Sequence, residues 1–161
     1  MHTRDFGNSL PILFAELTEG APLTGAYMTN RGDPGLLRSL DKLSATAASK
    51  LTANGSSIAA HVDHLRYGLS LMNRWAAGEN PFDDADWSVS WRKTRVTAAE
   101  WKKLRDDLGA ESRRWLAALR EPREITETDL NSVIGSIAHL AYHVGAIRQI
   151  DLSARGPSAN D

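Results

Sequence analysis

Four of the five histidines fall into two closely spaced pairs. His61 and His64 are three residues apart, and His139 and His143 form an H-x-x-x-H pair. On a helix, residues three or four positions apart lie on one face, about one turn from each other. Imidazoles at this spacing can share one ion, and neutral imidazole binds Zn²⁺ and Ni²⁺ well. The sequence therefore predicts a divalent metal site built from two helices.

The two pairs also have an interpretation without a metal. A lone inward-facing histidine is more often a hydrogen-bonded core residue, and H-x-x-x-H pairs arise by chance in many helices. The second pair favours a metal, because protonated imidazoles collected in a core would repel one another and lose their hydration. The chain has no cysteine, so its ligands must offer nitrogen or oxygen.

Glycine and proline mark where the helices that carry these pairs begin and end. Thr97 and Glu100 form a capping box, which is typical of a helix N-terminus. No strand-like alternation of apolar and polar residues appears. We therefore expect an all-α fold, a four-helix bundle with an extra N-terminal helical segment. The expected segments are 9–19 as the N-terminal extra, then 34–53 with a break near 43, 56–77, 97–120 and 126–152.

A long loop, residues 78–96, separates the second and third main helices, and loops of this length in a compact domain are usually functional or packed over something. Its aspartates could reach the site as a base or a fourth ligand, although a solvated acidic loop is the favoured interpretation. Its tryptophans are expected to anchor the loop by burying area, with a cover over a pocket mouth as the alternative. These residues are Asp83, Asp84, Asp86, Trp87 and Trp91.

The last predicted helix places small side chains beside its histidines. Ser132, Gly135 and Ser136 fall on the same side as His139 and His143, and this leaves room for a bound group.

Composition limits the classes of partner. The chain has 161 residues, 42% of them hydrophobic, and a net charge of -1, which favours one globular domain, 1–152, with a disordered tail, 153–161. This balance gives no basic field for nucleic acid or an anionic membrane. No apolar run of membrane-spanning length and no secretory signal is present, so we expect a cytoplasmic protein.

Two segments, NGSSIAAHVDHLRYGLSLMNRW and NSVIGSIAHLAYHVGAIRQI, resemble the DinB-like (DinB/YfiT) superfamily of bacterial four-helix metal proteins. In that family a Ser/Thr-hydrophobic start leads to a ligand histidine on the second helix. A later H-x-x-x-H, followed by glycine and isoleucine, completes a three-histidine site. Here His64 follows Ser57 by seven residues, and Gly145 and Ile147 continue the later motif. The similarity spans about residues 33–152.

The resemblance implies a ligand set of His64, His139 and His143, holding Zn²⁺ or Ni²⁺. His61 also faces inward, nearer the centre of the apolar arc, so the helix angles alone leave either residue of its pair as the ligand. The family match favours His64 and gives His61 a role in the pocket wall or behind a ligand, with direct ligation as the alternative.

Three protein nitrogens leave one coordination position open, as in catalytic metal sites. Leu140 follows His139, so the glutamate of the H-E-x-x-H proteases is missing and peptide hydrolysis is not expected. The resemblance implies a homodimeric, metal-dependent thiol S-transferase that uses a low-molecular-weight thiol and a small-molecule substrate, or a related isomerase. The alternatives are a non-catalytic metal-binding stress or interaction protein, whose site a fourth protein ligand would close, and a metal-free bundle.

Overall fold

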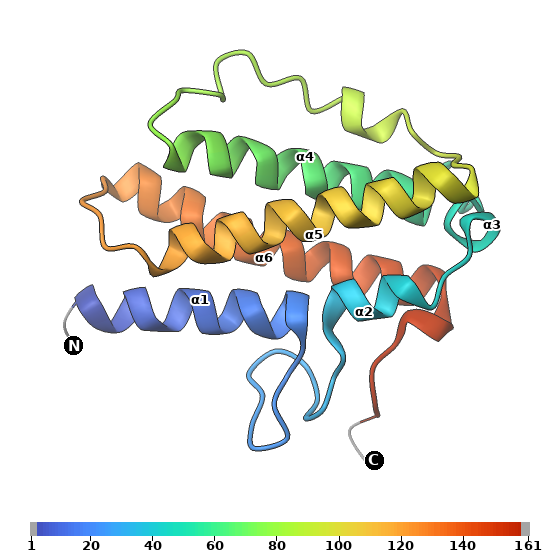
Figure 1. Ribbon diagram of the computed structural model, residues 1–161, viewed down its shortest axis with the longest axis horizontal. Coiled ribbons are helices and arrows are strands. Elements are labelled where there is room, and N and C mark those ends of the chain that lie inside the picture. The colour runs from blue at the N-terminus through green and yellow to red at the C-terminus, as the bar shows by residue number, and fades with distance from the viewer. Residues whose placement is uncertain (1–2, 159–161) are drawn as a thin grey trace.

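The computed structural model describes residues 3–158, with side chains from residue 7 onward, and this part of the chain is helical without strands. Four long helices run along the long axis of the molecule (Figure 1). They are α1 (Thr3–Glu19), α4 (Ile58–Ala76), α5 (Ala98–Arg120) and α6 (Glu127–Ile150). The short elements are α2 (Gly35–Asp41), α3 (Ala45–Ala48), and the 3-10 turns η1 (Val89–Trp91) and η2 (Leu152–Ala154).

Side-chain caps fix where three of the long helices, α4, α5 and α6, begin. The Ser57 hydroxyl accepts from a backbone N–H in the first turn of α4. Thr97 with Glu100 and Thr126 with Asp129 form complete capping boxes at α5 and α6. Each cap satisfies N–H groups that have no partner within the helix. The predicted starts of these three helices are confirmed.

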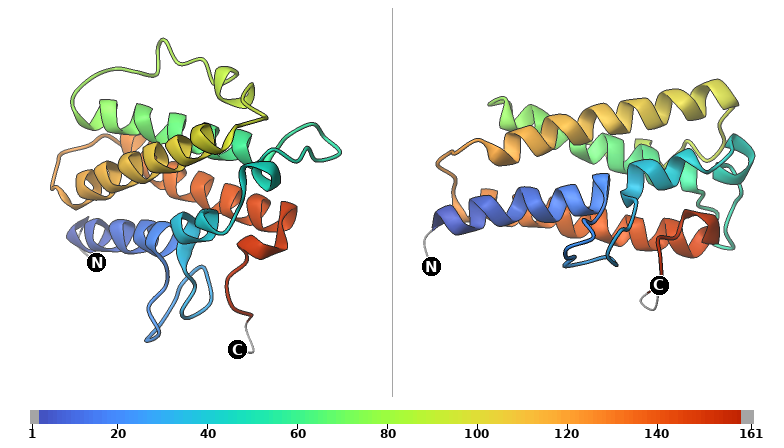
Figure 2. Two further views of the ribbon diagram at one scale, coloured as in Figure 1. Left: turned by 45° about the vertical axis from the view of Figure 1, so that its right-hand side comes forward. Right: turned by 60° about the horizontal axis from the view of Figure 1, so that its bottom comes forward.

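The N-terminal third differs from the prediction. The segment expected as a short extra, 9–19, belongs to the full-length helix α1, and the main helix expected over 34–53 is the two short helices α2 and α3. Burial of Phe14 and Leu17 stabilises α1 despite a proline in its interior. Ser44 accepts from the Ala47 N–H and so starts α3 anew. Figure 2 shows α2 beyond the end of α1, where the two helices together line one side of the molecule.

One cluster of buried side chains joins the four long helices. Each large apolar side chain that becomes fully buried contributes roughly 1.5–3 kcal/mol. Fully buried members from the four long helices include Phe14, Val62, Leu108, Trp115 and Leu140. None of the helices in the described region, 3–158, combines the length and apolar character that a membrane span requires.

The loop 78–96 lies over the outer face of α4 (Figure 1). The Ser57 hydroxyl donates to the Thr94 carbonyl at 2.7 Å and so ties the end of this loop to the start of α4. Asp63 of α4 is buried as well, with 8% of its surface exposed. Asp63 is paired with Arg66 one turn later.

The tail predicted as disordered, 153–161, continues the fold over its described part. The Asp151 carboxylate accepts from Ser153 N–H and caps η2, and Ala154 is fully buried. Asn30 donates from its amide to the Pro157 carbonyl at 2.8 Å. Residues 159–161 lie outside the described region.

Candidate metal centre

The structure brings both histidine pairs together where α4 packs against α6. His64 Nε2 lies 3.0 Å from His139 Nε2, which in turn lies 3.0 Å from His143 Nε2. One ligand atom from each of these three residues lies within 4.8 Å of the other two. Tetrahedral zinc with bonds of about 2.1 Å holds its nitrogens about 3.4 Å apart, so the spacing of these rings fits one ion.

The protonation of His64 follows from its neighbour Ser90. The Ser90 hydroxyl donates its single proton to the Trp87 carbonyl at 2.9 Å, and its oxygen lies 2.8 Å from His64 Nδ1. That oxygen must therefore accept from His64 Nδ1–H. A neutral imidazole has one N–H, so His64 Nε2 carries a lone pair, and this lone pair faces the other two rings.

His61 approaches the group from outside. Its Nδ1 lies 2.8 Å from His143 Nδ1, on the side of that ring away from the shared centre. If His61 accepts from His143 Nδ1–H, the Nε2 of His143 is left with a lone pair. This is the arrangement in which a partner behind the ring fixes the tautomer of a metal-binding histidine. The geometry therefore places His64 beside His139, and His61 behind His143.

The number of protons on the facing nitrogens distinguishes this cluster from an ordinary hydrogen-bonded core. His139 Nε2 faces two other Nε2 atoms, but an imidazole nitrogen has one in-plane position, filled by a proton or by a lone pair. That single position cannot form two linear hydrogen bonds. Three lone pairs directed at one cation would satisfy all three nitrogens at once.

Burial keeps these imidazoles uncharged at neutral pH. Loss of hydration, followed by repulsion from neighbouring histidines, lowers the pKa of His143 to about 3 and that of His64 to about 4. Burial also lowers the pKa of His61 and of His139. Metal ions bind the deprotonated imidazole, so the site holds its ligands in the reactive form.

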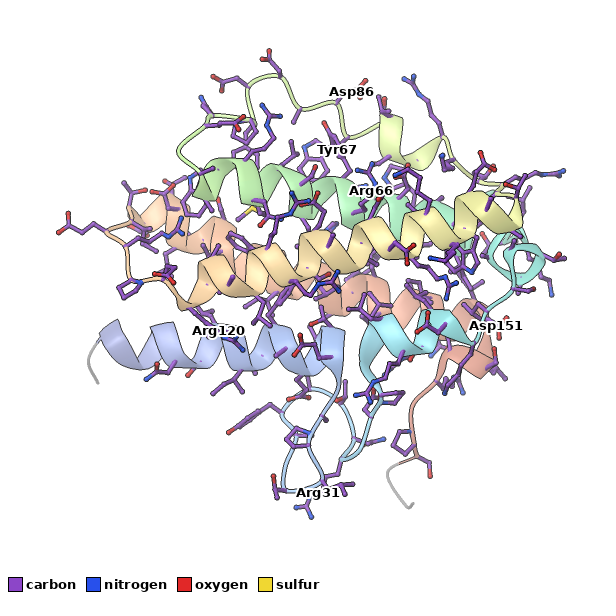
Figure 3. The ribbon with its side chains drawn as sticks, viewed as in Figure 1. Arg31, Arg66, Tyr67, Asp86, Arg120 and Asp151 are labelled. Carbon is purple, nitrogen blue, oxygen red and sulfur yellow. The ribbon has the colours of Figure 1, made fainter. Side chains whose placement is uncertain are left out.

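Two tryptophans of the 78–96 loop cover the histidine cluster. The Trp91 ring stacks on His64, with centroids 4.5 Å apart, and meets the His61 ring edge-on at 5.2 Å. The Trp87 ring lies 5.6 Å from that of His64. Figure 3 shows Tyr67 extending from α4 towards Asp86 of the loop, whose N–H donates to the Tyr67 hydroxyl oxygen at 3.1 Å. The tryptophans thus cover the site as well as anchoring the loop.

The three loop aspartates face solvent. The Asp83 carboxylate accepts from the Asn80 amide, and that of Asp86 accepts from Ser88. Asp84 is exposed. None of the three belongs to the metal-binding group found among the described residues. The geometry agrees with the solvated acidic loop.

A pocket of about 220 Å³ opens beside His139. The α6 residues expected to leave space next to the histidines, Ser132, Gly135 and Ser136, all line it. The opposite wall comes from α4 and the 78–96 loop. A group bound in this pocket would therefore lie next to the imidazole at the centre of the cluster.

Sequence reasoning missed Ser90 and Phe82. Ser90 is buried and sets the tautomer of His64, and Phe82 forms part of the pocket wall. Both lie on the irregular 78–96 loop, where no helical period relates a residue to the site. The two flanking tryptophans, Trp87 and Trp91, were the available signal that this stretch packs inward.

The chain was compared with models of known protein families, with curated proteins and with solved structures, and none of the three comparisons found a match.

Proposed function

We propose that this protein binds one divalent metal ion, Zn²⁺ or Ni²⁺, through the Nε2 atoms of His64, His139 and His143. The observation that carries the proposal is the convergence of three Nε2 atoms, with Ser90 behind the His64 ring and His61 behind the His143 ring as partners for the opposite nitrogens. Imidazole nitrogen suits both ions, and the low pKa values remove competition from protons at neutral pH.

We further propose that the ion serves a metal-dependent enzyme acting on a small molecule, with a low-molecular-weight thiol as cosubstrate. A bound divalent ion supplies Lewis acidity and lowers the pKa of a coordinated water or thiol. The support is a three-nitrogen donor set with a pocket beside His139 and no carboxylate in the group. The wider assignment, a DinB-like four-helix bundle that works as a homodimer, rests on the sequence resemblance, and the proposed cytoplasmic location rests on the cysteine-free composition.

A non-catalytic metal-binding role is the second candidate, and one observation favours it. Trp91 stacks on His64, and Ser90 hydrogen-bonds the same ring, so an ion on His64 would also fix the 78–96 loop in place. In that case the ion would stabilise the fold, as structural zinc does.

Metal titration of tag-free protein tests the first proposal. We expect one Co²⁺ or Zn²⁺ per chain, with binding lost in His64→Ala and in His139→Ala. Lys103→Ala, on the exposed face of α5, is the matched control and should bind like the wild type. Uptake that is unchanged by both histidine substitutions would contradict the site.

A second measurement separates the two candidates. Addition of a small thiol to the Co²⁺ protein should change the visible absorption spectrum if a coordination position is open. An enzyme site predicts a saturable change, whereas a site closed by a fourth protein ligand predicts none.

A further inference from the structure

We propose that the pocket beside His139 binds the uncharged, apolar part of the small molecule that reaches the metal ion, and that Gly135 keeps this pocket open. The inference rests on the proposed metal centre and adds the substrate class to it. It predicts that the site binds compact apolar ligands in preference to carboxylates, phosphates and sulfonates.

The pocket wall carries no charged side chain. Apart from His139, its residues are apolar, small or hydroxyl-bearing. The apolar ones are Leu65, Leu69, Met72, Phe82, Trp87 and Leu140. An anionic group placed here would lose its hydration without gaining a cationic partner from the wall, whereas an apolar group gains by leaving water.

The two pocket hydroxyls have already used their protons. The Ser136 hydroxyl donates to the Val133 carbonyl at 2.7 Å and accepts from the Trp115 indole N–H at 3.1 Å. The Ser132 hydroxyl donates to the Thr128 carbonyl at 3.0 Å. Neither has a donor proton left for an anionic oxygen, so these serines supply space and leave the selectivity to the apolar wall.

The volume limits the size of the ligand. Apolar cavities of about 150 Å³ accept benzene, and pockets for drug-sized molecules measure roughly 300–1,000 Å³. At about 220 Å³, this pocket suits one aromatic ring or a short branched chain.

Two glycines shape the pocket in different ways. A Cβ on Gly68 would lie 3.3 Å from the Trp87 ring and 3.9 Å from His139 Cε1. The absence of a side chain at this position therefore lets the Trp87 ring pack closely against α4. A Cβ on Gly135 would meet nothing within 4 Å, although Gly135 lines the pocket. A larger side chain at 135 would therefore fill the pocket without disturbing the helix or the histidines.

Calorimetry on zinc-loaded protein tests the inference with two thiols of similar reactivity. Phenylmethanethiol carries an apolar ring, and 2-mercaptoethanesulfonate carries a fixed negative charge. We expect the apolar thiol to bind at least about tenfold more tightly, since it gains burial of its ring. We expect Gly135→Leu to lower the affinity for phenylmethanethiol by about tenfold or more, with zinc affinity unchanged. Ser132→Leu fills the same space from the preceding turn and should act alike.

Gly7→Leu is the matched control, because Gly7 is an exposed glycine of α1 with open space at its Cβ. It should bind zinc and both thiols like the wild type. Equal binding of the two thiols, or wild-type affinity for phenylmethanethiol in both pocket variants, would overturn the inference and leave the metal centre standing. Failure of the wild type to bind zinc would instead overturn the metal centre, and this inference with it.

Discussion

Helix α6 contributes to two buried polar clusters, which differ in how their polar atoms are paired. In its last turn, Arg148 donates to Asp33 Oδ1 at 2.7 Å, and the Gly35 N–H donates to the same oxygen at 2.8 Å. A turn or two earlier, His139 and His143 present nitrogens to other nitrogens. Both of these contacts in the first cluster join a donor to an acceptor, whereas the contacts in the second join one imidazole nitrogen to another.

Glu16 follows the pattern of the charged cluster. Its buried carboxylate accepts from the backbone N–H groups of Tyr27, Met28 and Thr29 at 2.7–2.8 Å, and from the Thr29 hydroxyl. These bonds fold the loop after α1 around one side chain. A buried group with a full set of partners is a structural element and needs no ligand.

The difference teaches how to separate a structural polar cluster from a binding site. Both are buried and both involve titratable groups. In the charged cluster an arginine cation faces a carboxylate, and only the Arg148 Nε–H is left without a partner among the described residues, whereas the histidine cluster has the donor set that a cation would complete. Metal should therefore affect the histidine region alone, and breaking an ion pair should affect stability alone.

The largest expected effect is on metal affinity in His143→Ala. The substitution removes one of three ligands and also leaves His61 Nδ1 without its partner. Loss of a partner behind a ligand already lowers metal affinity about 10–100-fold, so loss of the ligand should lower it by more than about 100-fold. Calorimetric titration with Zn²⁺ measures the change. Circular dichroism should show a folded protein, and zinc binding of wild-type strength would refute the assignment.

Breaking the charged cluster should lower the stability of the protein and leave its zinc affinity unchanged. Arg148→Met leaves the Asp33 carboxylate, whose side chain is 2% exposed, without its cation. Removing one partner of a buried ion pair costs about 3–5 kcal/mol in the free energy of unfolding. Urea unfolding of the metal-free protein should show this loss, with zinc affinity per folded chain unchanged. A parallel fall in zinc affinity would mean that the two clusters are coupled through α6.

Acid should distinguish the histidine cluster from the buried Glu16 in the metal-free protein. In the unfolded chain histidine takes up protons below pH 6.5, but in the folded protein the pKa values of His64 and His143 are about 4 and 3. The unfolded state therefore binds more protons between these limits, and stability should fall as pH drops from about 6.5 towards 4. Burial raises the pKa of Glu16, but its backbone hydrogen bonds outweigh this and hold it below 4.5, so Glu16 contributes only at lower pH. Thermal unfolding at pH 7 and pH 5 measures the loss, and a flat profile would contradict it.

The smallest expected effect comes from Ser90→Ala. It removes the acceptor of His64 Nδ1–H but leaves the ligand nitrogen in place. We expect zinc affinity to fall about tenfold, at the lower end of the range for such partners. Ser88→Ala, on the exposed part of the same loop, is the control. Long-range ¹H–¹⁵N NMR should also show His64 losing its preference for the Nδ1–H tautomer, and an unchanged tautomer would show that another group fixes it.

Local sequence patterns predicted much of this arrangement. Capping residues such as Ser57 and Thr97 fixed helix starts, and the three- and four-residue spacings placed two imidazoles on one face of each helix. Small residues such as Gly135 predicted the space beside His139. These features depend on one helix at a time.

Features that depend on how the helices pack were beyond such patterns. The choice between His61 and His64 is set by where α4 packs on α6, since both face inward. The role of Ser90 depends on how the 78–96 loop crosses α4. The length of α1 depends on burial of Phe14 in a core to which the distant helices contribute.

The most direct test of the central claim is a crystal structure of the zinc-loaded protein with anomalous scattering recorded at the zinc edge. The account predicts one peak bonded to the Nε2 atoms of His64, His139 and His143 at about 2.0–2.1 Å, with His61 behind His143. A peak elsewhere, or none in protein saturated with zinc, would contradict it.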